Sequence, residues 1–195
     1  EDEVRREIDH VFPHEQIRCS EGRRLLFDNA DQRDAVQALI QAPVGVLTGG
    51  PGTGKTTTAA ALLAVYKRLN PDAEPEHILI TAPTGKAACR IGASISKAST
   101  FLRNLSETER AFLRGVRALT LHRALEWRPI PPEKGGPFQR NSQRRLSARF
   151  VIVDEASMVD LALMHALVSA MADSGRLILL GDADQLESVE AGGCL

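Results

Sequence analysis

The sequence is short of cysteine, of net charge and of long apolar runs, and each shortage excludes a class of protein. Its cysteines, Cys19, Cys89 and Cys194, lie far apart, so no pair has the close spacing of a zinc knuckle or a redox dithiol. This spacing favours reduced thiols in a cytoplasmic protein. A formal net charge of −1 gives no global basic field for a nucleic-acid partner, although a neutral protein can still carry a basic groove. No apolar run is long enough to span a bilayer, so we expect no membrane partner.

What the sequence does contain is the composition of one globular domain. Its 195 residues suffice for a domain with its own core, and 43% of them are hydrophobic while 25% are charged. The chain opens on Glu1 without an initiator Met and closes on Gly192, Gly193, Cys194 and Leu195. We therefore expect it to be part of a longer polypeptide.

Short apolar runs that alternate with helical patterns predict the fold class. Buried strands are expected at residues 44–48, 78–81, 150–154 and 177–180. Helices are expected at residues 3–12, 21–28, 32–41, 55–69, from 86 onward, 107–114 and 161–172. A Ser106–Glu109 capping box and Asp160 mark two helix starts, and the Pro- and Arg-rich residues 128–145 are expected to form a loop. The alternation predicts an α/β protein with a parallel sheet covered by helices on both faces.

Residues 49–56 fit the phosphate-loop pattern G-x-x-x-x-G-K-[ST] in full, between a predicted strand and a predicted helix. Glycines let backbone N–H groups converge on phosphate oxygens, and the start of the following helix adds a positive dipole end. Lys55 is placed to reach the β- and γ-phosphates, and the Thr56 hydroxyl to bind Mg²⁺. The predicted nucleotide-binding residues here are Gly50, Pro51, Gly52, Thr53, Gly54, Lys55, Thr56 and Thr57. A glycine-rich turn that fits by chance is the alternative.

Two carboxylates follow the predicted strand at 150–154, at the sheet edge where α/β proteins bind ligands. We assign Asp154 to Mg²⁺ and Glu155 to the attacking water, which it would orient and deprotonate. Gln185 follows the strand at 177–180, and its amide is suited to sense the γ-phosphate. Taken singly, the pair and Gln185 read equally as surface-loop residues, and the complete phosphate loop favours the functional interpretation.

Together these motifs resemble the superfamily 1 helicases, and among them the RecD-like family, the alpha subunit of exodeoxyribonuclease V and its relatives. The resemblance runs from about Gln32 to the C-terminus and rests on five stretches in the order that the family requires. These stretches are residues 49–58, 82–88, 120–123, 153–158 and 180–186. The resemblance implies a RecA-like P-loop fold, ATP and Mg²⁺ as cofactors, and DNA unwinding in recombination and double-strand-break repair.

The resemblance also implies roles that the spacing does not show. Gln32 is similar to the family's adenine-reading Gln, although it also suits an amphipathic helix. A stretch implied to hold the backbone of single-stranded DNA consists of Pro83, Thr84, Gly85 and Lys86, for which helix capping is the alternative. Thr120 and His122 are implied to line the same DNA path, and a structural role is the alternative for His122.

The family pattern also implies parts that this chain lacks. We expect residues 1–28 to be a flanking segment without activity and residues 29–195 to be the ATP-binding motor domain. A second RecA-like domain with arginine fingers is implied beyond Leu195, as are other subunits of a helicase–nuclease complex. Four arginines of this chain match no such arginine-finger motif, namely Arg90, Arg103, Arg144 and Arg145.

Two other functions compete with a helicase motor. One is another P-loop NTPase, such as a kinase or a nucleotide switch. An Asp-Glu pair with a distal Gln favours water as the acceptor, and hence hydrolysis. The other is a nucleotide-binding module without turnover, which this chain would resemble in isolation if the arginine fingers lie elsewhere.

Overall fold

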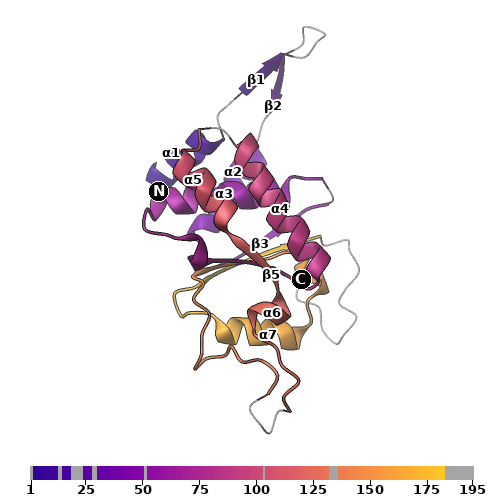
Figure 1. Cartoon of the computed structure of the whole chain (residues 1–195). Helices are drawn as coiled ribbons and strands as arrows, with labels where there is room; N and C mark the ends of the chain where they lie inside the picture. Colours follow the sequence, from indigo (N-terminus) through magenta and orange to yellow (C-terminus); the bar gives the residue numbers. More distant parts are fainter. Residues whose placement is uncertain are drawn as a thin grey trace.

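A five-stranded parallel sheet forms the centre of the computed structural model (Figure 1). The structure describes residues 2–12, 15–18, 24–27, 30–50, 52–102, 104–131 and 136–182. The strands of this sheet are β3 (Val44–Thr48), β4 (Ile78–Ala82), β5 (Arg117–Thr120), β6 (Phe150–Val153) and β7 (Arg176–Gly181). They pair in the order β3-β7-β6-β4-β5, and every pair is parallel. All five strands therefore end at the same edge of the sheet, and the described residues of the five stretches of the sequence resemblance lie at these strand ends or directly after them.

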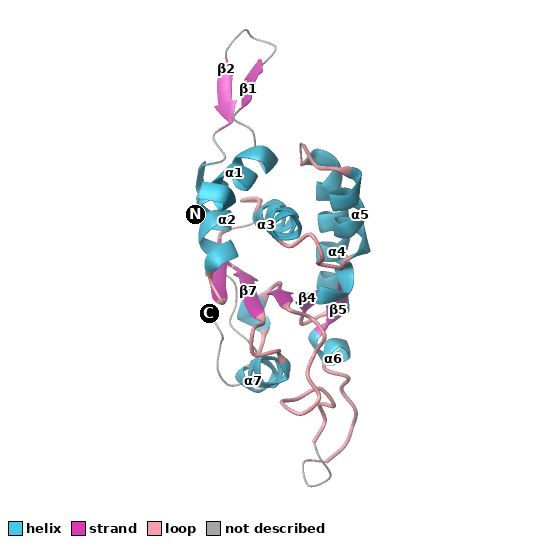
Figure 2. Cartoon of the chain, turned by 90° about the vertical axis from the view of Figure 1, so that its left-hand side faces the viewer, coloured by secondary structure: helices cyan, strands magenta, loops and turns pink. Residues whose placement is uncertain are grey.

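Helices cover both faces of the sheet, as Figure 2 shows. One face carries α1 (Asp2–Val11), α2 (Ala30–Gln41), α3 (Lys55–Leu69), α4 (Gly85–Phe101) and α5 (Glu107–Gly115). The other face carries α6 (Leu121–Ala124) and α7 (Leu161–Ala170). Two short 3-10 helices, η1 (Pro75–His77) and η3 (Ala156–Met158), precede β4 and follow β6. The predicted parallel α/β fold is confirmed.

Alternate residues of each strand face opposite helix layers, because side chains alternate along a strand. In β6, Phe150 and Ile152 pack against the layer of α1 to α5, whereas Val151 and Val153 pack against the layer of α6 and α7. All four are fully buried. This two-sided burial explains why the strand appears in the sequence as a continuous apolar run.

Helix α3, which follows the phosphate loop, lies in the middle of its layer and packs against α1, α2, α4 and α5. Residues 59–65 are fully buried, and the four alanines among them let neighbouring helices approach closely. A helix that is apolar on every side is buried and packs against neighbours on every side. The first turn of α3, which carries Lys55 and Thr56, is therefore fixed in place by the core.

A buried ion pair joins α3 to α5. Arg68 pairs with Glu109, whose carboxylate also accepts a hydrogen bond from the backbone N–H of Ser106 at 2.6 Å. This contact completes the predicted capping box. Burial alone would raise the pKa of Glu109, but the hydrogen bonds from Arg68 and Ser106 hold it below its ordinary value. The pair therefore stabilises the fold above the ordinary pKa, and this contribution is lost as pH falls through the lowered one.

The prediction of a helix at residues 21–28 was wrong. Residues Arg24–Phe27 form β2, which pairs antiparallel with β1 (Glu15–Arg18) in a separate two-stranded sheet. A run of Arg-Leu-Leu-Phe is compatible with either state, and the partner strand decides between them. The sequence analysis also missed β5, whose four residues lack the length and the continuous apolar character of the other strands.

Strand β3 is less buried than its sequence suggests. Val44 is 59% exposed and Val46 is 49% exposed, because β3 has a neighbour, β7, on one side only within the described residues. The expectation of a buried strand was therefore correct in position and wrong in burial. An apolar run does not distinguish an edge strand from a central one.

The described part of residues 128–145 forms the expected loop, without helix or extended strand. An isolated bridge joins Trp127 to Phe138, and the Arg128 N–H donates to the Pro137 carbonyl at 2.8 Å. Arg140 pairs with Glu126 at 2.6 Å. These contacts connect residues 126–128 to residues 137–140.

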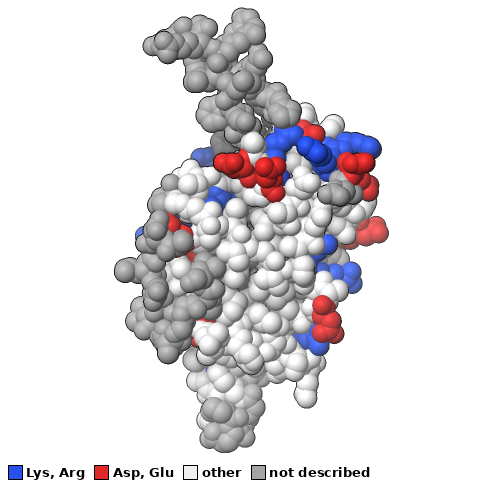
Figure 3. Space-filling view, turned by 180° about the vertical axis from the view of Figure 1, so that it is seen from behind, with Lys and Arg blue, Asp and Glu red and all other residues white. Residues whose placement is uncertain are grey.

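The described residues form no broad basic surface on the face of the molecule opposite to the one seen in Figure 1. On the face seen in Figure 3, charges of both signs gather along the upper rim and one side, and the described centre is largely uncharged. Among the described helices, none is long and apolar enough to cross a membrane.

Candidate functional site

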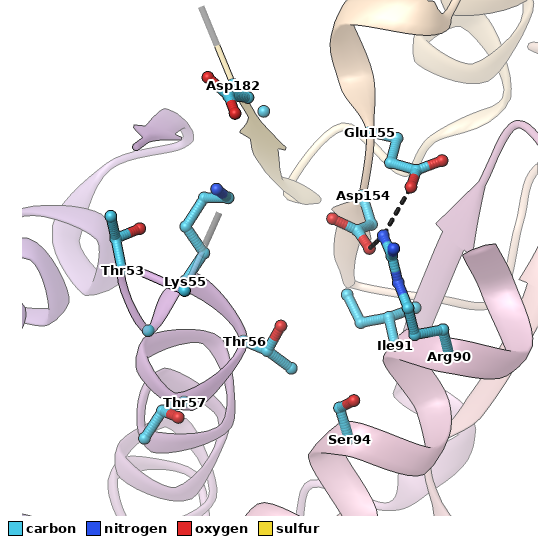
Figure 4. Close-up of a pocket in the computed structure, with 13 residues that line it drawn as sticks. Thr53, Lys55, Thr56, Thr57, Arg90, Ile91, Ser94, Asp154, Glu155 and Asp182 are labelled. Carbon is cyan, nitrogen blue, oxygen red and sulfur yellow. Dashed lines mark hydrogen bonds and ion pairs between the residues drawn. The ribbon is translucent and has the colours of Figure 1, made fainter. Parts of the chain in front are cut away.

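A cavity of about 390 Å³ opens at the carboxyl edge of the sheet, between the phosphate loop and α4. Figure 4 shows Lys55 and Thr56 on one side of it, and Asp154, Glu155 and Arg90 on the other. The lining comprises Gly52, Thr53, Gly54, Lys55, Thr56, Thr57, Arg90, Ile91, Ser94, Asp154, Glu155, Gly181 and Asp182. The structure thus brings the predicted phosphate loop and the predicted acidic pair into one cavity.

The loop presents unpaired backbone donors to this cavity. The first hydrogen bond of α3 runs from the Thr58 N–H to the Gly54 carbonyl at 2.9 Å, and no side chain caps the helix. The N–H groups of the three residues before Thr58 therefore lack intrahelical acceptors. Gly52 and Gly54 have φ values of 79° and 87°, a left-handed conformation that glycine adopts without strain. The arrangement fits the oxygens of a phosphate group.

The side chains of Lys55 and Thr53 donate hydrogen bonds to backbone carbonyls of the phosphate loop itself. The Lys55 ammonium donates to the Gly49 carbonyl and, at 2.9 Å, to the Gly50 carbonyl. The Thr53 hydroxyl donates to the same Gly50 oxygen at 2.9 Å. The ammonium charge is thus held at the rim of the cavity by two neutral acceptors, which phosphate oxygens can replace with a stronger, charge-assisted contact.

Asp154 directly follows β6, and its backbone N–H donates to the Thr81 carbonyl of the neighbouring β4 at 2.8 Å. Its side chain is 13% exposed. Burial raises the pKa of this carboxyl above its ordinary value, and the charge of Glu155 adds to the rise. The Glu155 N–H, Arg90 and Lys55 oppose it. A buried carboxylate with a raised pKa favours a cationic ligand.

Glu155 adopts a left-handed backbone conformation, with φ 53° and ψ 41°. For a residue other than glycine this costs roughly 1–3 kcal/mol, and such strain clusters at functional sites. The turn carries the carboxylate away from the strand direction, toward α4. Its side chain is 20% exposed, which leaves it open to water in the cavity.

Arg90 is one member of the site that sequence analysis missed. Its guanidinium lies 2.5 Å from Glu155 Oε1 and 3.9 Å from Asp154 Oδ2. Arg90 matches no arginine-finger motif, but it lies four residues after Lys86 on a predicted helix. That spacing places the two side chains on one helix face and could have drawn attention to Arg90. Asp182, just after β7, also lines the cavity without having been assigned a role.

The residues present fit a magnesium ion that is shared with a phosphate. No group of three or more His, Cys, Asp and Glu within the described ranges could hold a metal by itself. Mg²⁺ characteristically binds one or two carboxylates together with substrate phosphates and water, rather than a protein cage. Asp154 and Thr56, on opposite sides of the same cavity, supply that limited set of oxygens.

Some predicted site residues lie outside this cavity. Pro51 and Gln185 fall outside the described residues, so their predicted roles stay predictions. Gln32, on α2, is half-buried and does not line the cavity. Its amide lies against Gly54, where a Cβ would collide with Gln32 Nε2. Gln32 is thus next to the phosphate loop without lining the cavity.

The residues predicted to contact DNA lie farther along the same sheet edge, at the ends of β4 and β5. Thr84 caps α4 by accepting from the Ala87 N–H at 3.2 Å, and Thr120 caps α6 by accepting from the Arg123 N–H at 3.2 Å. Thr84 therefore has the capping contact that was the alternative for residues 83–86, and Thr120 caps its own helix in the same way. Pro83, Gly85 and Lys86 lie in the same turn, where Gly85 and Lys86 are exposed.

His122 has the structural contacts that the alternative reading anticipated. Its ring lies 6.2 Å from Trp127 and 6.3 Å from Phe138, measured between ring centroids. Trp127 is 46% exposed, so the cluster still presents an aromatic surface. Capping and ring packing leave these residues free to contact a ligand as well.

The raised pKa of Asp154 gives a testable effect on stability. Between the ordinary and the raised pKa, the folded chain binds more protons than the unfolded chain, so the free energy of unfolding falls as pH rises. Asp154→Asn removes the free-energy cost of holding a negative charge at this buried position. We expect the variant to be more stable than the wild type at neutral pH without Mg²⁺, and the difference to vanish below the ordinary pKa. Denaturation across pH measures this.

Asp173→Asn is the matched control, because its carboxylate is 92% exposed and should change stability by less than about 0.5 kcal/mol. A lower unfolding midpoint for Asp154→Asn at neutral pH would contradict the argument.

A parallel sheet with a phosphate loop after one strand and an acidic pair after another defines a P-loop NTPase of the RecA-like type. The family model described as AAA domain matches residues 32–191. The RecBCD enzyme subunit RecD of Mycobacterium tuberculosis is 46% identical over 167 residues, which cover 85% of this chain and 28% of that protein. The chain therefore belongs to the RecD-like helicase family of AAA-domain proteins.

A second relative agrees with this assignment, and a solved structure agrees with the fold. The ATP-dependent RecD2 DNA helicase of Deinococcus radiodurans is 35% identical over 162 residues, which cover 83% of this chain and 18% of that protein. The crystal structure of the Pif1 helicase from Candida albicans matches with a TM-score of 0.52 at 23% identity, over 85% of this chain and 35% of that one, and supports the fold. The chain spans less than a third of the curated relatives it matches.

Proposed function

We propose that residues 29–195 are the ATP-binding motor domain of a DNA helicase that acts in recombination and double-strand-break repair. The observation that carries this proposal is the cavity that joins the phosphate loop to Asp154 and Glu155. Farther along the same sheet edge lie the exposed residues that follow β4 and β5. Nucleotide and nucleic acid would thus bind to neighbouring parts of one rigid edge.

The cavity would hold ATP by its phosphates. The N–H groups at the start of α3 would bind phosphate oxygens, and the Lys55 ammonium would leave the Gly49 and Gly50 carbonyls for the β- and γ-phosphates. Thr56 and Asp154 would hold Mg²⁺, which neutralises phosphate charge when bound. Gln32 lies next to Gly54 of the phosphate loop, and from there it would contact the adenine edge.

Glu155 would act on the attacking water. Its carboxylate is the acceptor beside Asp154 that is not needed for the metal, and it is open to solvent in the cavity. It would orient a water molecule toward the γ-phosphorus and accept its proton as the new P–O bond forms. The bond from γ-phosphorus to the bridging oxygen breaks, which yields ADP and inorganic phosphate. Gln185, four residues beyond β7 in the sequence, would sense the γ-phosphate.

Single-stranded DNA would lie across the exposed turn that begins α4. A backbone phosphate would meet the Lys86 ammonium and the Gly85 backbone, close to the positive end of the α4 dipole. The path would continue past Thr120 and His122, where Trp127 offers an aromatic face. Contacts of this kind hold the strand without reading its sequence.

The remaining parts of the helicase motor would come from outside residues 1–195. A second RecA-like domain would close on the nucleotide and supply arginine fingers, in keeping with relatives more than three times as long. The relative's name, RecBCD enzyme subunit, supports assembly with further subunits in an exodeoxyribonuclease V-like complex. A kinase or a switch is the weaker alternative, because Glu155 lies where a water molecule would be activated.

Steady-state ATP hydrolysis by the full-length protein, with and without single-stranded DNA, tests the proposal. We expect hydrolysis that the DNA stimulates. Hydrolysis without stimulation would favour a switch-like NTPase. Nucleotide binding without any turnover would favour a binding module.

A further inference from the structure

The ion pair between Arg90 and Glu155 connects the nucleotide-binding part of the sheet edge to the part that we propose binds DNA. Arg90 is on α4, whose first turn carries the proposed DNA contacts, and Glu155 follows β6 and lies across the cavity from the phosphate loop. Figure 4 shows the guanidinium reaching across from α4 to the acidic pair. Of the described cavity-lining residues, Arg90 is the one that touches the proposed water-activating group from the DNA side.

The pair occupies Glu155 in a way that interferes with its proposed role. Arg90 Nη2 donates to Oε1 of the carboxylate at 2.5 Å, and its charge is shared with Asp154 at 3.9 Å. An oxygen that accepts a hydrogen bond from a guanidinium is a poorer acceptor for a water proton. The carboxylate is also held toward α4, on the opposite side of the cavity from Lys55.

The same guanidinium is within reach of the proposed DNA path. Lys86 and Arg90 are four residues apart on the exposed face of α4, about 6 Å along its axis. The residues on the other face, Ala87 and Ala88, are buried. A phosphate bound to Lys86 would therefore lie one helical turn from the base of the Arg90 side chain.

Arg90 can exchange partners without movement of the helix. Its side chain is 63% exposed, and so exposed an ion pair is weak and easily replaced. The backbone of α4 is fixed, since Ile91 and Ile95 are each 1% exposed in the core. A phosphate attracts a guanidinium with the geometry and charge of a carboxylate. Rotation of the side chain toward DNA is thus the motion that the structure permits.

We propose that Arg90 is a positioning residue that couples DNA binding to ATP hydrolysis. Without DNA, its guanidinium holds the Glu155 carboxylate and restrains hydrolysis. When single-stranded DNA binds at the start of α4, a backbone phosphate takes the guanidinium and releases Glu155 toward the attacking water. This inference rests on the proposed function, because it requires both hydrolysis and DNA at these positions.

Arg90→Gln in the full-length protein tests the coupling. Hydrolysis without DNA should rise at least about fivefold, in the range of ordinary coupling between sites. The stimulation by DNA should fall by a similar factor, and the KM for ATP should change by less than about twofold. Arg90→Lys keeps the positive charge but loses the planar guanidinium. Its hydrolysis without DNA and its stimulation by DNA should therefore lie between those of the wild type and of Arg90→Gln.

DNA binding gives a second readout that does not depend on turnover. With a single-stranded oligonucleotide and no nucleotide, the slope of log affinity against log salt should fall by about 0.7 in Arg90→Gln, the loss of one phosphate contact. Arg114→Gln is the matched control. Arg114 also pairs with an exposed glutamate, Glu107, but lies on α5 away from the cavity.

The outcomes separate the two proposals. If the wild type shows DNA-stimulated hydrolysis but Arg90→Gln lowers turnover equally with and without DNA, or changes neither, the coupling role is wrong and the proposed function stands. If the wild type shows no stimulation, both fail. Thermal unfolding of each variant confirms that the comparison concerns folded protein.

Discussion

Residues 1–195 alone are expected to hydrolyse ATP about 10³–10⁵-fold more slowly than the full-length protein does with single-stranded DNA. Phosphoryl transfer spreads negative charge over the γ-phosphate oxygens, and Lys55 with Mg²⁺ offsets only part of it. Arg90 supplies no further charge there, because it pairs with Glu155. The family resemblance implies that the missing arginines come from a second domain.

Translocation also requires two domains that approach and separate around nucleotide while each holds DNA. The 195 residues should therefore unwind nothing, even if DNA binds weakly at the start of α4. Steady-state assays of the two proteins, each with and without DNA, make the comparison. Equal DNA-stimulated turnover in both would show that these residues are a complete enzyme.

Glu155→Gln in the full-length protein is expected to lower turnover by about 10²–10⁴-fold while nucleotide binding persists. Glutamine has the shape of glutamate and keeps an oxygen that can accept from Arg90, but it cannot take a proton from water at neutral pH. The loss should therefore appear in kcat, with little change in KM. Single-turnover kinetics and nucleotide titration separate these quantities.

Glu107→Gln serves as the control for the same chemical change, because Glu107 is an exposed residue of α5 outside the cavity. It should leave kcat unaltered. A Glu155→Gln variant with full turnover would show that another group activates the water, and it would remove the basis for the Arg90 proposal as well.

The parts of the fold that were predictable share a physical cause. Strands β4, β6 and β7 are buried on both faces, so each contains a run of at least three consecutive apolar residues and their positions follow directly. The phosphate loop is a local motif whose glycines have one well-understood use. Both kinds of signal are complete within a few consecutive residues.

The parts that were missed depend on contacts distant in sequence. Strand β2 forms because β1 pairs with it, and β3 is exposed because it lies at an edge of the sheet. Arg90 belongs to the site because β6 follows β4 in space, which brings Glu155 to α4 although the two residues are 65 apart in the chain. No local pattern carries that information.

Calorimetric titration of residues 1–195 with ATP and Mg²⁺ tests the central claim most directly, because it examines the cavity without the rest of the machine. The account predicts one saturable site and a higher unfolding temperature, since a ligand that binds only the folded state stabilises it. Lys55→Ala should weaken this binding, whereas Lys97→Ala, exposed on α4 and outside the cavity lining, should not. Absence of both heat and any shift in unfolding temperature for the wild type would contradict the account.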